Sequence, residues 1–208
     1  MTVPFIPGKT VEVPDIPFAD SVTLAAGDAA VIVVDMQNDF VKPGGTLVVP
    51  AASETLPAIQ DLLKRARLAG ARVVYTQDTH REGDPEWQIW PEHCRLDSWG
   101  WQIVEELTPR PDDLVVQKNR YDAFFDTELD YYLARLWKVN QLVIVGTVSS
   151  ICVAHTAASA GLRWYSIVVP ANGISALTEF DQALTLRQVS WLYTGQVVKS
   201  IADVEFVP

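Results

Sequence analysis

Short apolar runs rich in β-branched residues recur along the chain, and longer segments with helical spacing lie between them. This alternation is typical of βα units that build a parallel sheet. The runs lack the in-and-out alternation of half-exposed strands, so we expect helices on both faces of the sheet. The predicted strands are 30–35, 72–77, 113–118, 141–146, 165–170 and 195–200. The predicted fold class is therefore α/β, a three-layer α/β/α arrangement around a six-stranded, mainly parallel sheet.

Helical spacing and end signals predict five helices between these strands. Ser53 is the expected N-cap of the first helix, and Gly70 is expected to end it. Residues 1–28 are rich in proline and predict an extended arm, while residues 29–208 predict a single domain, because one core supports a unit of this size. The predicted helices are 53–69, 98–107, 126–137, 152–162 and 179–193.

The net charge of −10, without a cluster of lysine or arginine, argues against nucleic acid or an anionic membrane as a partner. No apolar run approaches the roughly 20 residues that span a bilayer, and the N-terminal stretch lacks the pattern of a secretory signal. Two cysteines in 208 residues make no disulfide framework, so both are expected to be free thiols in a reducing compartment. These features predict a soluble, cytoplasmic protein.

Polar side chains follow four of the predicted strands. Asp35, Asp78 and Lys118 stand at the ends of three strands, and Cys152 comes shortly after a fourth. Right-handed crossovers place all these strand ends on one edge of a parallel sheet, where function is expected. Taken singly, Asp35 could cap a turn, Lys118 could be a solvated charge, and Cys152 could be a small core residue.

Together the strand-end residues predict a cysteine nucleophile. Cys152 is expected at the start of a helix, where the helix dipole would stabilise a thiolate and lower its ordinary pKa of about 8.5. Lys118 would lower this pKa further, and Asp35 could take the thiol proton and pass it to a leaving group. Small residues at 146–150 predict a turn with exposed N–H groups that can form an oxyanion hole.

Three segments resemble the signature segments of the isochorismatase-like cysteine hydrolases. They read "VIVVDMQNDF", "VVQKNRYDAFFDTELD" and "LVIVGTVSSICVAHTAASAG", and the resemblance covers about residues 28–200. It implies a catalytic triad of Asp35, Lys118 and Cys152. It also implies a cis peptide between Thr147 and Val148, which turns the N–H groups of Val148 and Cys152 toward the substrate oxyanion.

The stretch from Thr76 to Cys94 resembles the metal and ring-binding segment of the nicotinamidase branch. That branch uses an Asp-x-His pair and a histidine from a "WPxHC" segment, and "WPEHC" occurs at 90–94. The resemblance implies a divalent metal, zinc with iron or manganese as alternatives, and Asp84 or Glu86 would supply any fourth ligand. A lone histidine is more often a hydrogen-bonding residue than a ligand, and Asp78 could simply cap the loop. The implied metal ligands are Asp78, His80 and His93, and the implied ring walls are Phe40 and Trp90.

The activity implied by the resemblance is cleavage of a small carboxamide to an acid and ammonia through a thioester on Cys152. Nicotinamide is the first substrate expected, and carbamoyl or ureido amides are the alternatives, because the segment between the two histidines is short and Ile151 makes the pocket apolar. A non-catalytic oligomeric scaffold is a further alternative. No nucleotide cofactor is expected, since no G-x-G-x-x-G turn follows the first strand. Cys94 is expected to be structural, and the chain is expected to form a homodimer or homotetramer.

Overall fold

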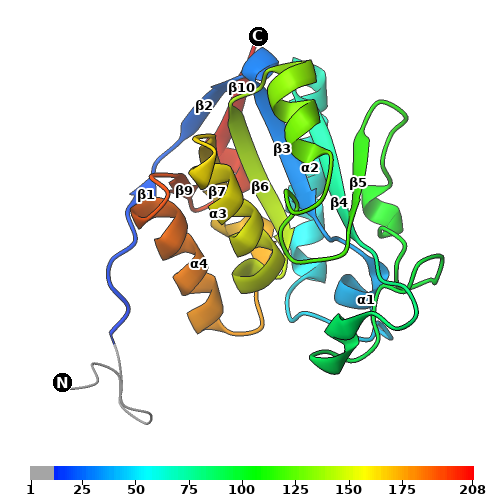
Figure 1. Cartoon of the computed structure of the whole chain (residues 1–208). Helices are drawn as coiled ribbons and strands as arrows, with labels where there is room; N and C mark the ends of the chain where they lie inside the picture. Colours follow the sequence, from blue (N-terminus) through cyan, green and yellow to red (C-terminus); the bar gives the residue numbers. More distant parts are fainter. Residues whose placement is uncertain (1–11) are drawn as a thin grey trace.

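The computed structural model describes residues 12–208, and its centre is a parallel sheet (Figure 1). The six predicted strands are confirmed, and two strands of two residues each extend the sheet. The strand order is β1-β9-β7-β6-β3-β4-β5, with β8 added beside the end of β6. The strands of this sheet are β1 Phe18–Ala19, β3 Ala29–Val34, β4 Arg72–Asp78, β5 Leu114–Lys118, β6 Gln141–Thr147, β7 Ser166–Pro170, β8 Ile174–Ser175 and β9 Gln196–Val198.

A second, two-stranded parallel sheet joins the beginning of the described chain to its end. It pairs β2 (Val22–Ala25) with β10 (Val204–Val207). Together β1, β2 and the short 3-10 turn η1 (Ala26–Asp28) form the part of the expected arm that the structure describes. Residues 1–11 of that arm lie outside the described residues, so the division into arm and domain stays a prediction.

Three of the predicted helices are confirmed in place. The α-helices are α1 Asn38–Val41, α2 Leu56–Ala69, α3 Ala154–Leu162 and α4 Glu179–Trp191. The π-helical segments are η5 Tyr131–Trp137 and η6 Ser149–Val153, and further 3-10 turns are η2 Ser53–Thr55, η3 Pro85–Gln88, η4 Glu105–Leu107, η7 Ala171–Gly173 and η8 Ile201–Asp203. Within residues 12–208, no helix has the length and apolar character needed to cross a membrane.

The ends of α2 show one correct and one wrong prediction. Gly70 has a φ of +91° and closes the helix in the left-handed conformation, with its N–H pointing back to the carbonyls of Ala66 and Arg67. Ser53 does not cap the helix, because the 3-10 turn η2 precedes it and no side chain bonds to the first N–H groups of α2.

The helix predicted at 98–107 is wrong, because this segment pairs with the start of α1, which follows β3. The N–H groups of Asn38 and Asp39 bind the carbonyls of Gln102 and Gly100. A side chain at Gly100 would also meet the carboxylate of Asp39 at 2.1 Å. Only η4 remains helical. The helix predicted at 126–137 begins later than expected, with the π-helical segment η5.

Helices cover both faces of the sheet, as predicted. Val31 and Val33 of β3 pack into the core beneath α2, whereas Ile32 and Val34 pack into the core beneath α3, α4 and η5. In Figure 1, α3 and α4 lie side by side over one face. The sheet is therefore a rigid middle layer, and its strand ends fix whatever side chains stand on them.

Candidate active site

Lys118 joins the strand-end residues into one cluster. Its fully buried Nζ lies 2.7 Å from Asp35 Oδ2 and 3.1 Å from Asp78 Oδ1, and it donates to Cys152 Sγ over 3.7 Å. Register explains part of this convergence, since Asp78 and Lys118 are paired at the ends of β4 and β5. The structure thus brings together the three residues predicted as a triad.

Asp35 is held from behind by Thr76, which the sequence did not single out. The Thr76 hydroxyl donates to Asp35 Oδ1 over 2.6 Å and accepts from the Asp35 N–H over 3.1 Å. Asp35 adopts a φ of +48°, which turns it out of the line of β3. Oδ2 of Asp35 lies 2.7 Å from Lys118 Nζ, and this ion pair uses one of the oxygen's two lone pairs. The other lone pair can accept a proton.

The turn that carries Cys152 has the form that the sequence resemblance implies. The Thr147–Val148 peptide is cis, and Cys152 lies in η6, between β6 and α3. Gly146 has a φ of +116°, and a Cβ there would meet the Val34 carbonyl oxygen at 2.1 Å. Only glycine fits at this crossing of β3 and β6.

Burial reverses the expected effect on the cysteine. It raises the pKa of the Cys152 thiol well above its ordinary value, although the Lys118 ammonium acts in the opposite direction. Burial likewise raises the pKa of Asp35, against the lowering effect of Lys118. The pKa of Lys118 is also raised, because Asp35 and Asp78 outweigh the lowering effect of burial. The resting cluster therefore holds a protonated thiol beside a charged lysine, and the prediction of a low thiol pKa is wrong.

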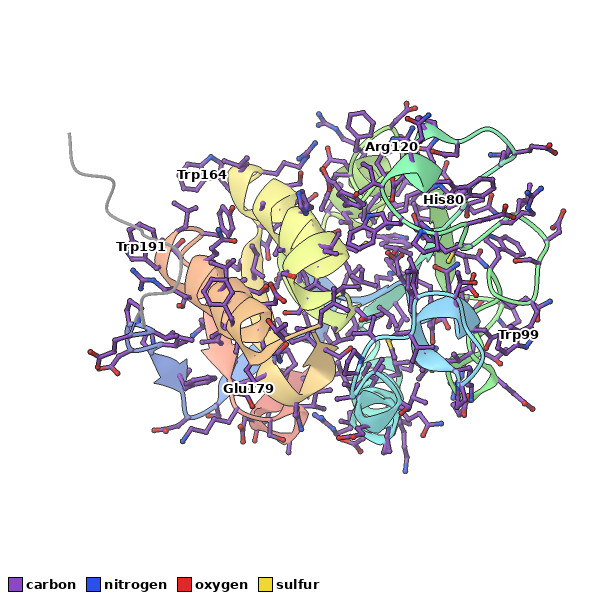
Figure 2. The ribbon with its side chains drawn as sticks, turned by 90° about the horizontal axis from the view of Figure 1, so that it is seen from below. His80, Trp99, Arg120, Trp164, Glu179 and Trp191 are labelled. Carbon is purple, nitrogen blue, oxygen red and sulfur yellow. The ribbon has the colours of Figure 1, made fainter. Side chains whose placement is uncertain are left out.

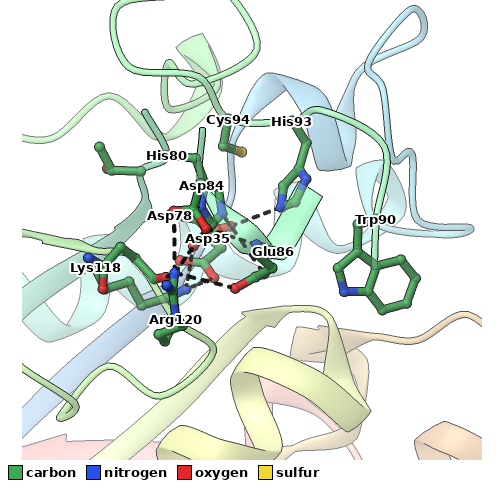
Figure 3. A network of polar contacts seen from close by, with 12 residues as sticks. Asp35, Asp78, His80, Asp84, Glu86, Trp90, His93, Cys94, Lys118 and Arg120 are labelled. Atoms are coloured by element: carbon green, nitrogen blue, oxygen red, sulfur yellow. Dashed lines mark hydrogen bonds and ion pairs between the residues drawn. The ribbon is translucent and has the colours of Figure 1, made fainter. Parts of the chain in front are cut away.

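A second cluster of buried ligand-type side chains adjoins the first. Each of its four residues offers one atom, and these atoms lie within 4.8 Å of one another. Two imidazoles and two carboxylates are a donor set that suits zinc and related divalent metals. Lys118 and the histidines lower the pKa of Asp78 despite its burial, so this carboxylate is ionised and fit for a cation. The residues are Asp78, His80, Glu86 and His93 (Figure 3).

Of the two candidates for a fourth ligand, Glu86 joins the cluster and Asp84 lies behind it. Asp84 Oδ2 is 2.9 Å from His80 Nδ1, so the other ring nitrogen, Nε2, faces Asp78 at 3.0 Å. Asp84 Oδ1 also accepts the Glu86 N–H over 2.9 Å, and Arg120 Nη1 lies 3.2 Å from that same oxygen. A carboxylate behind a ligating histidine orients its ring.

The ligand cluster lies far from the exposed tryptophans of the helical layer. Figure 2 shows His80 and Arg120 far from the exposed Trp164 and Trp191.

Gln37 fixes the backbone of Asp78. Its side-chain carbonyl accepts the Asp78 N–H over 2.8 Å, and its amide donates to the Asp78 carbonyl over 2.9 Å. The same amide nitrogen donates to the Trp101 carbonyl over 2.8 Å. The Gln37 side chain thus makes the backbone hydrogen bonds to β4 that strand β3, which ends at Val34, no longer makes.

Asp39 connects two loops that approach the site. Its Oδ1 accepts the N–H of Thr46 over 3.0 Å, and its Oδ2 accepts the N–H of Cys94 over 2.7 Å. The Cys94 thiol is buried, and burial raises its pKa well above its ordinary value. A neutral thiol suits the structural role expected for Cys94, which stays a prediction.

A cavity of about 250 Å³ opens between the two clusters. Phe40 and Trp90, the two residues expected as ring walls, both line it, and their contact with a substrate ring stays a prediction. We did not predict Tyr121 as a site residue from the sequence. It follows Lys118 by only three residues, so its position close to the end of β5 could have indicated it. The lining residues are Phe40, Thr46, Leu47, Val48, Val49, Asp78, Glu86, Trp90, His93, Tyr121, Val148, Ile151, Cys152 and Leu177.

Comparison with known proteins assigns the family. Residues 29–202 match the isochorismatase domain. A ureidoacrylate amidohydrolase of Caulobacter segnis is 32% identical over 187 residues, which are 77% of this chain and 78% of that protein. Two solved structures are also similar. The N-carbamoylsarcosine amidase of Thermoplasma acidophilum has 32% identity and a TM-score of 0.75, covering 82% of this chain and 95% of its own. The pyrazinamidase of Pyrococcus horikoshii in complex with zinc has 26% identity and a TM-score of 0.77, covering 82% and 98%. The chain therefore belongs to the isochorismatase family of hydrolases.

Proposed function

We propose that this hydrolase cleaves a small carboxamide to a carboxylic acid and ammonia, with Cys152 as nucleophile. Asp35 takes the thiol proton while Sγ attacks the carbonyl carbon, and the N–H groups of Val148 and Cys152 bind the resulting oxyanion. The C–N bond then breaks, and Asp35 returns the proton to the departing ammonia. Water attacks the thioester, gives one proton to Asp35, and releases the acid as that proton passes to Sγ.

We propose that the Lys118 ammonium stabilises the negative charges that occur during the catalytic cycle. In the resting cluster its ammonium is balanced by Asp35 and Asp78, at 2.7 and 3.1 Å. When the thiol proton moves to Asp35, the new thiolate lies within reach of the same ammonium. Charge separation in a water-poor site is favourable only beside a fixed counter-charge, and Lys118 supplies it.

The second cluster is proposed to bind a divalent metal through Asp78, His80, Glu86 and His93. A bound ion would supply a Lewis acid for a lone pair on the substrate. Asp84 holds the His80 ring by its Nδ1, so Nε2 points to the shared centre. His93 is fixed in a similar way, since its Nδ1 lies 2.8 Å from the Pro91 carbonyl and leaves Nε2 toward Asp78.

The charge of the cavity wall is the observation that favours a neutral ring amide. Among residues 12–208, the side chains that line the cavity include the carboxylates of Asp78 and Glu86 but no arginine or lysine. The rest of the cavity wall is mainly aliphatic and aromatic. A flat, uncharged amide with a ring nitrogen suits such a wall, whereas a substrate carboxylate would need a cation. We therefore propose nicotinamide or a similar heteroaromatic carboxamide as the substrate.

Relatives favour a second candidate. The amidohydrolase from Caulobacter segnis acts on ureidoacrylate, and it is more similar in sequence than the zinc-bound pyrazinamidase. A ureido or carbamoyl acid could be accommodated if the bound metal, rather than a basic side chain, received its carboxylate. This candidate predicts turnover of acidic ureido compounds and weak turnover of ring amides.

Ammonia release from a matched substrate panel tests the proposal. The panel contains nicotinamide, pyrazinamide, ureidoacrylate and N-carbamoylsarcosine, each assayed with the zinc-loaded protein and with the chelated protein. We expect the largest kcat/KM for the two ring amides and its loss after chelation. A larger kcat/KM for the ureido acids would select the second candidate, and no ammonia from any amide would overturn the amidohydrolase assignment.

A further inference from the structure

A hydrogen bond joins Trp90 to a tyrosine on another loop. The indole Nε1–H of Trp90 donates to the Tyr121 hydroxyl over 3.0 Å. Both side chains line the cavity, and Trp90 stands apart from the polar cluster (Figure 3). We propose that Tyr121 is a specificity-determining residue that acts through Trp90, an inference that rests on the proposed amidase function.

Tyr121 is anchored on its own side of the cavity. It packs against the apolar core that includes Phe124 and Leu129, and its ring centroid lies 5.4 Å from that of His155 on α3. His155 is in turn fixed by a 2.7 Å contact between its Nδ1 and the Ile151 carbonyl, beside Cys152. The hydroxyl that meets Trp90 is therefore held by the same elements that hold the nucleophile.

Trp90 has fewer constraints of its own. It lies between η3 and His93 in a stretch of loop, and its backbone N–H binds the Glu86 carbonyl. The indole N–H is directed to Tyr121, so its side chain is tied across 31 residues of sequence to the loop after β5. Without that bond the indole could rotate on its loop, and the width of the cavity would no longer be set.

The bond also determines the chemistry of the wall. An indole N–H that already has an acceptor offers no further donor to a substrate, so Trp90 presents carbon surface to the cavity. Flat ring amides gain from stacking on such a surface, while short open-chain amides gain little. Tyr121 should therefore contribute to the preference for rings over open chains and should contribute little to the chemical steps at Cys152.

Tyr121→Phe tests this role, because it removes the hydroxyl and keeps the ring. We expect KM for nicotinamide to rise about fivefold, the effect of one neutral hydrogen bond, with kcat nearly unchanged. KM for an open-chain amide such as N-carbamoylsarcosine should stay the same. The matched control is Tyr165→Phe, which removes a 3.1 Å hydroxyl bond to Asp130 outside the cavity.

A double-mutant cycle shows whether Tyr121 acts through Trp90. Trp90→Phe keeps an aromatic wall without the N–H, so adding Tyr121→Phe to it should cause no further rise in KM. Calorimetric binding of nicotinamide to the same variants in a Cys152→Ala background should show the same pattern in Kd. Additive effects in the cycle, or equal changes for ring and open-chain amides, would overturn the inference alone. Failure of the wild-type protein to release ammonia from any ring amide would overturn the proposed ring-amide substrate as well.

Discussion

Asp78 and Lys118 are register partners on adjacent strands, and 3.1 Å separates the Oδ1 of one from the Nζ of the other. Asp78 reaches the two histidines with its second oxygen, at 3.0 Å from His80 Nε2 and 3.4 Å from His93 Nε2. The contact therefore couples the ligand cluster to the nucleophile cluster. A change of charge in one cluster must be felt in the other, because both lie in a buried region of low dielectric.

Removal of the nucleophile gives the most direct test of the mechanism. Cys152→Ala should lower kcat by at least about 10³-fold, because the variant lacks the thiol that forms the thioester. The variant should still bind substrate and show an unchanged melting temperature within a few degrees. Cys94→Ala serves as the thiol control and should keep most of the activity, since Cys94 does not line the cavity. Equal ammonia release by Cys152→Ala and wild-type protein would rule out the triad.

Loss of a cluster histidine should abolish metal binding. We expect His93→Ala to reduce zinc affinity by more than the roughly 10–100-fold typical of losing an outer partner of a ligand. His155→Ala is the matched control, because this exposed histidine contacts Tyr121 and Ile151 but none of the four cluster residues. Competition with a zinc-chelating dye measures both affinities without any turnover. Unchanged affinity in His93→Ala would exclude the ligand assignment.

The Thr76 hydroxyl should set the pH at which Asp35 can act. Burial raises the pKa of Asp35, and the hydrogen bond from Thr76 partly lowers it. Protonated Asp35 cannot take the thiol proton, so kcat/KM falls as the pH drops through this raised pKa. Thr76→Val removes the lowering contact and should move the acid limb of the profile to higher pH. Thr76→Ser keeps the hydroxyl and should leave the limb in place, whereas identical shifts in both variants would refute the role.

Asp39 should matter more for stability than its position in the short helix α1 suggests. Asp39→Ala leaves the buried N–H of Cys94 and the partly buried hydrogen bond of the Thr46 N–H without an acceptor, which costs about 2 kcal/mol in unfolding free energy. Urea denaturation measures this loss. Asp61→Ala is the control, because Asp61 makes an exposed pair with Arg65 whose contribution is within about 1 kcal/mol. A loss no larger than that of the control would show that water replaces the Asp39 carboxylate.

Strand ends were predictable because their signal is local. Each buried strand is a continuous apolar run, so Asp35, Asp78 and Lys118 could be placed on one edge from sequence alone. Tyr121 and Thr76 could not be assigned roles in this way, because their partners lie 31 and 41 residues away. The segment 98–107 shows the opposite limit, since its backbone carbonyls bind the first N–H groups of α1 and the segment does not form the helix that its spacing predicts. The pKa of Cys152 depends on burial, which helix position alone does not reveal. The oligomeric state and the cytoplasmic location stay predictions.

The amide of Gln37 has a consequence for how such an enzyme can diversify. Because this side chain holds both backbone groups of Asp78, the end of β4 is secured before the chain enters the loop at Thr79. Insertions or deletions between His80 and His93 can then reshape the ring wall without displacing the carboxylate that Lys118 needs. Substrate range and bond-breaking chemistry are thereby separable traits, and new amides can be recruited by loop exchange alone.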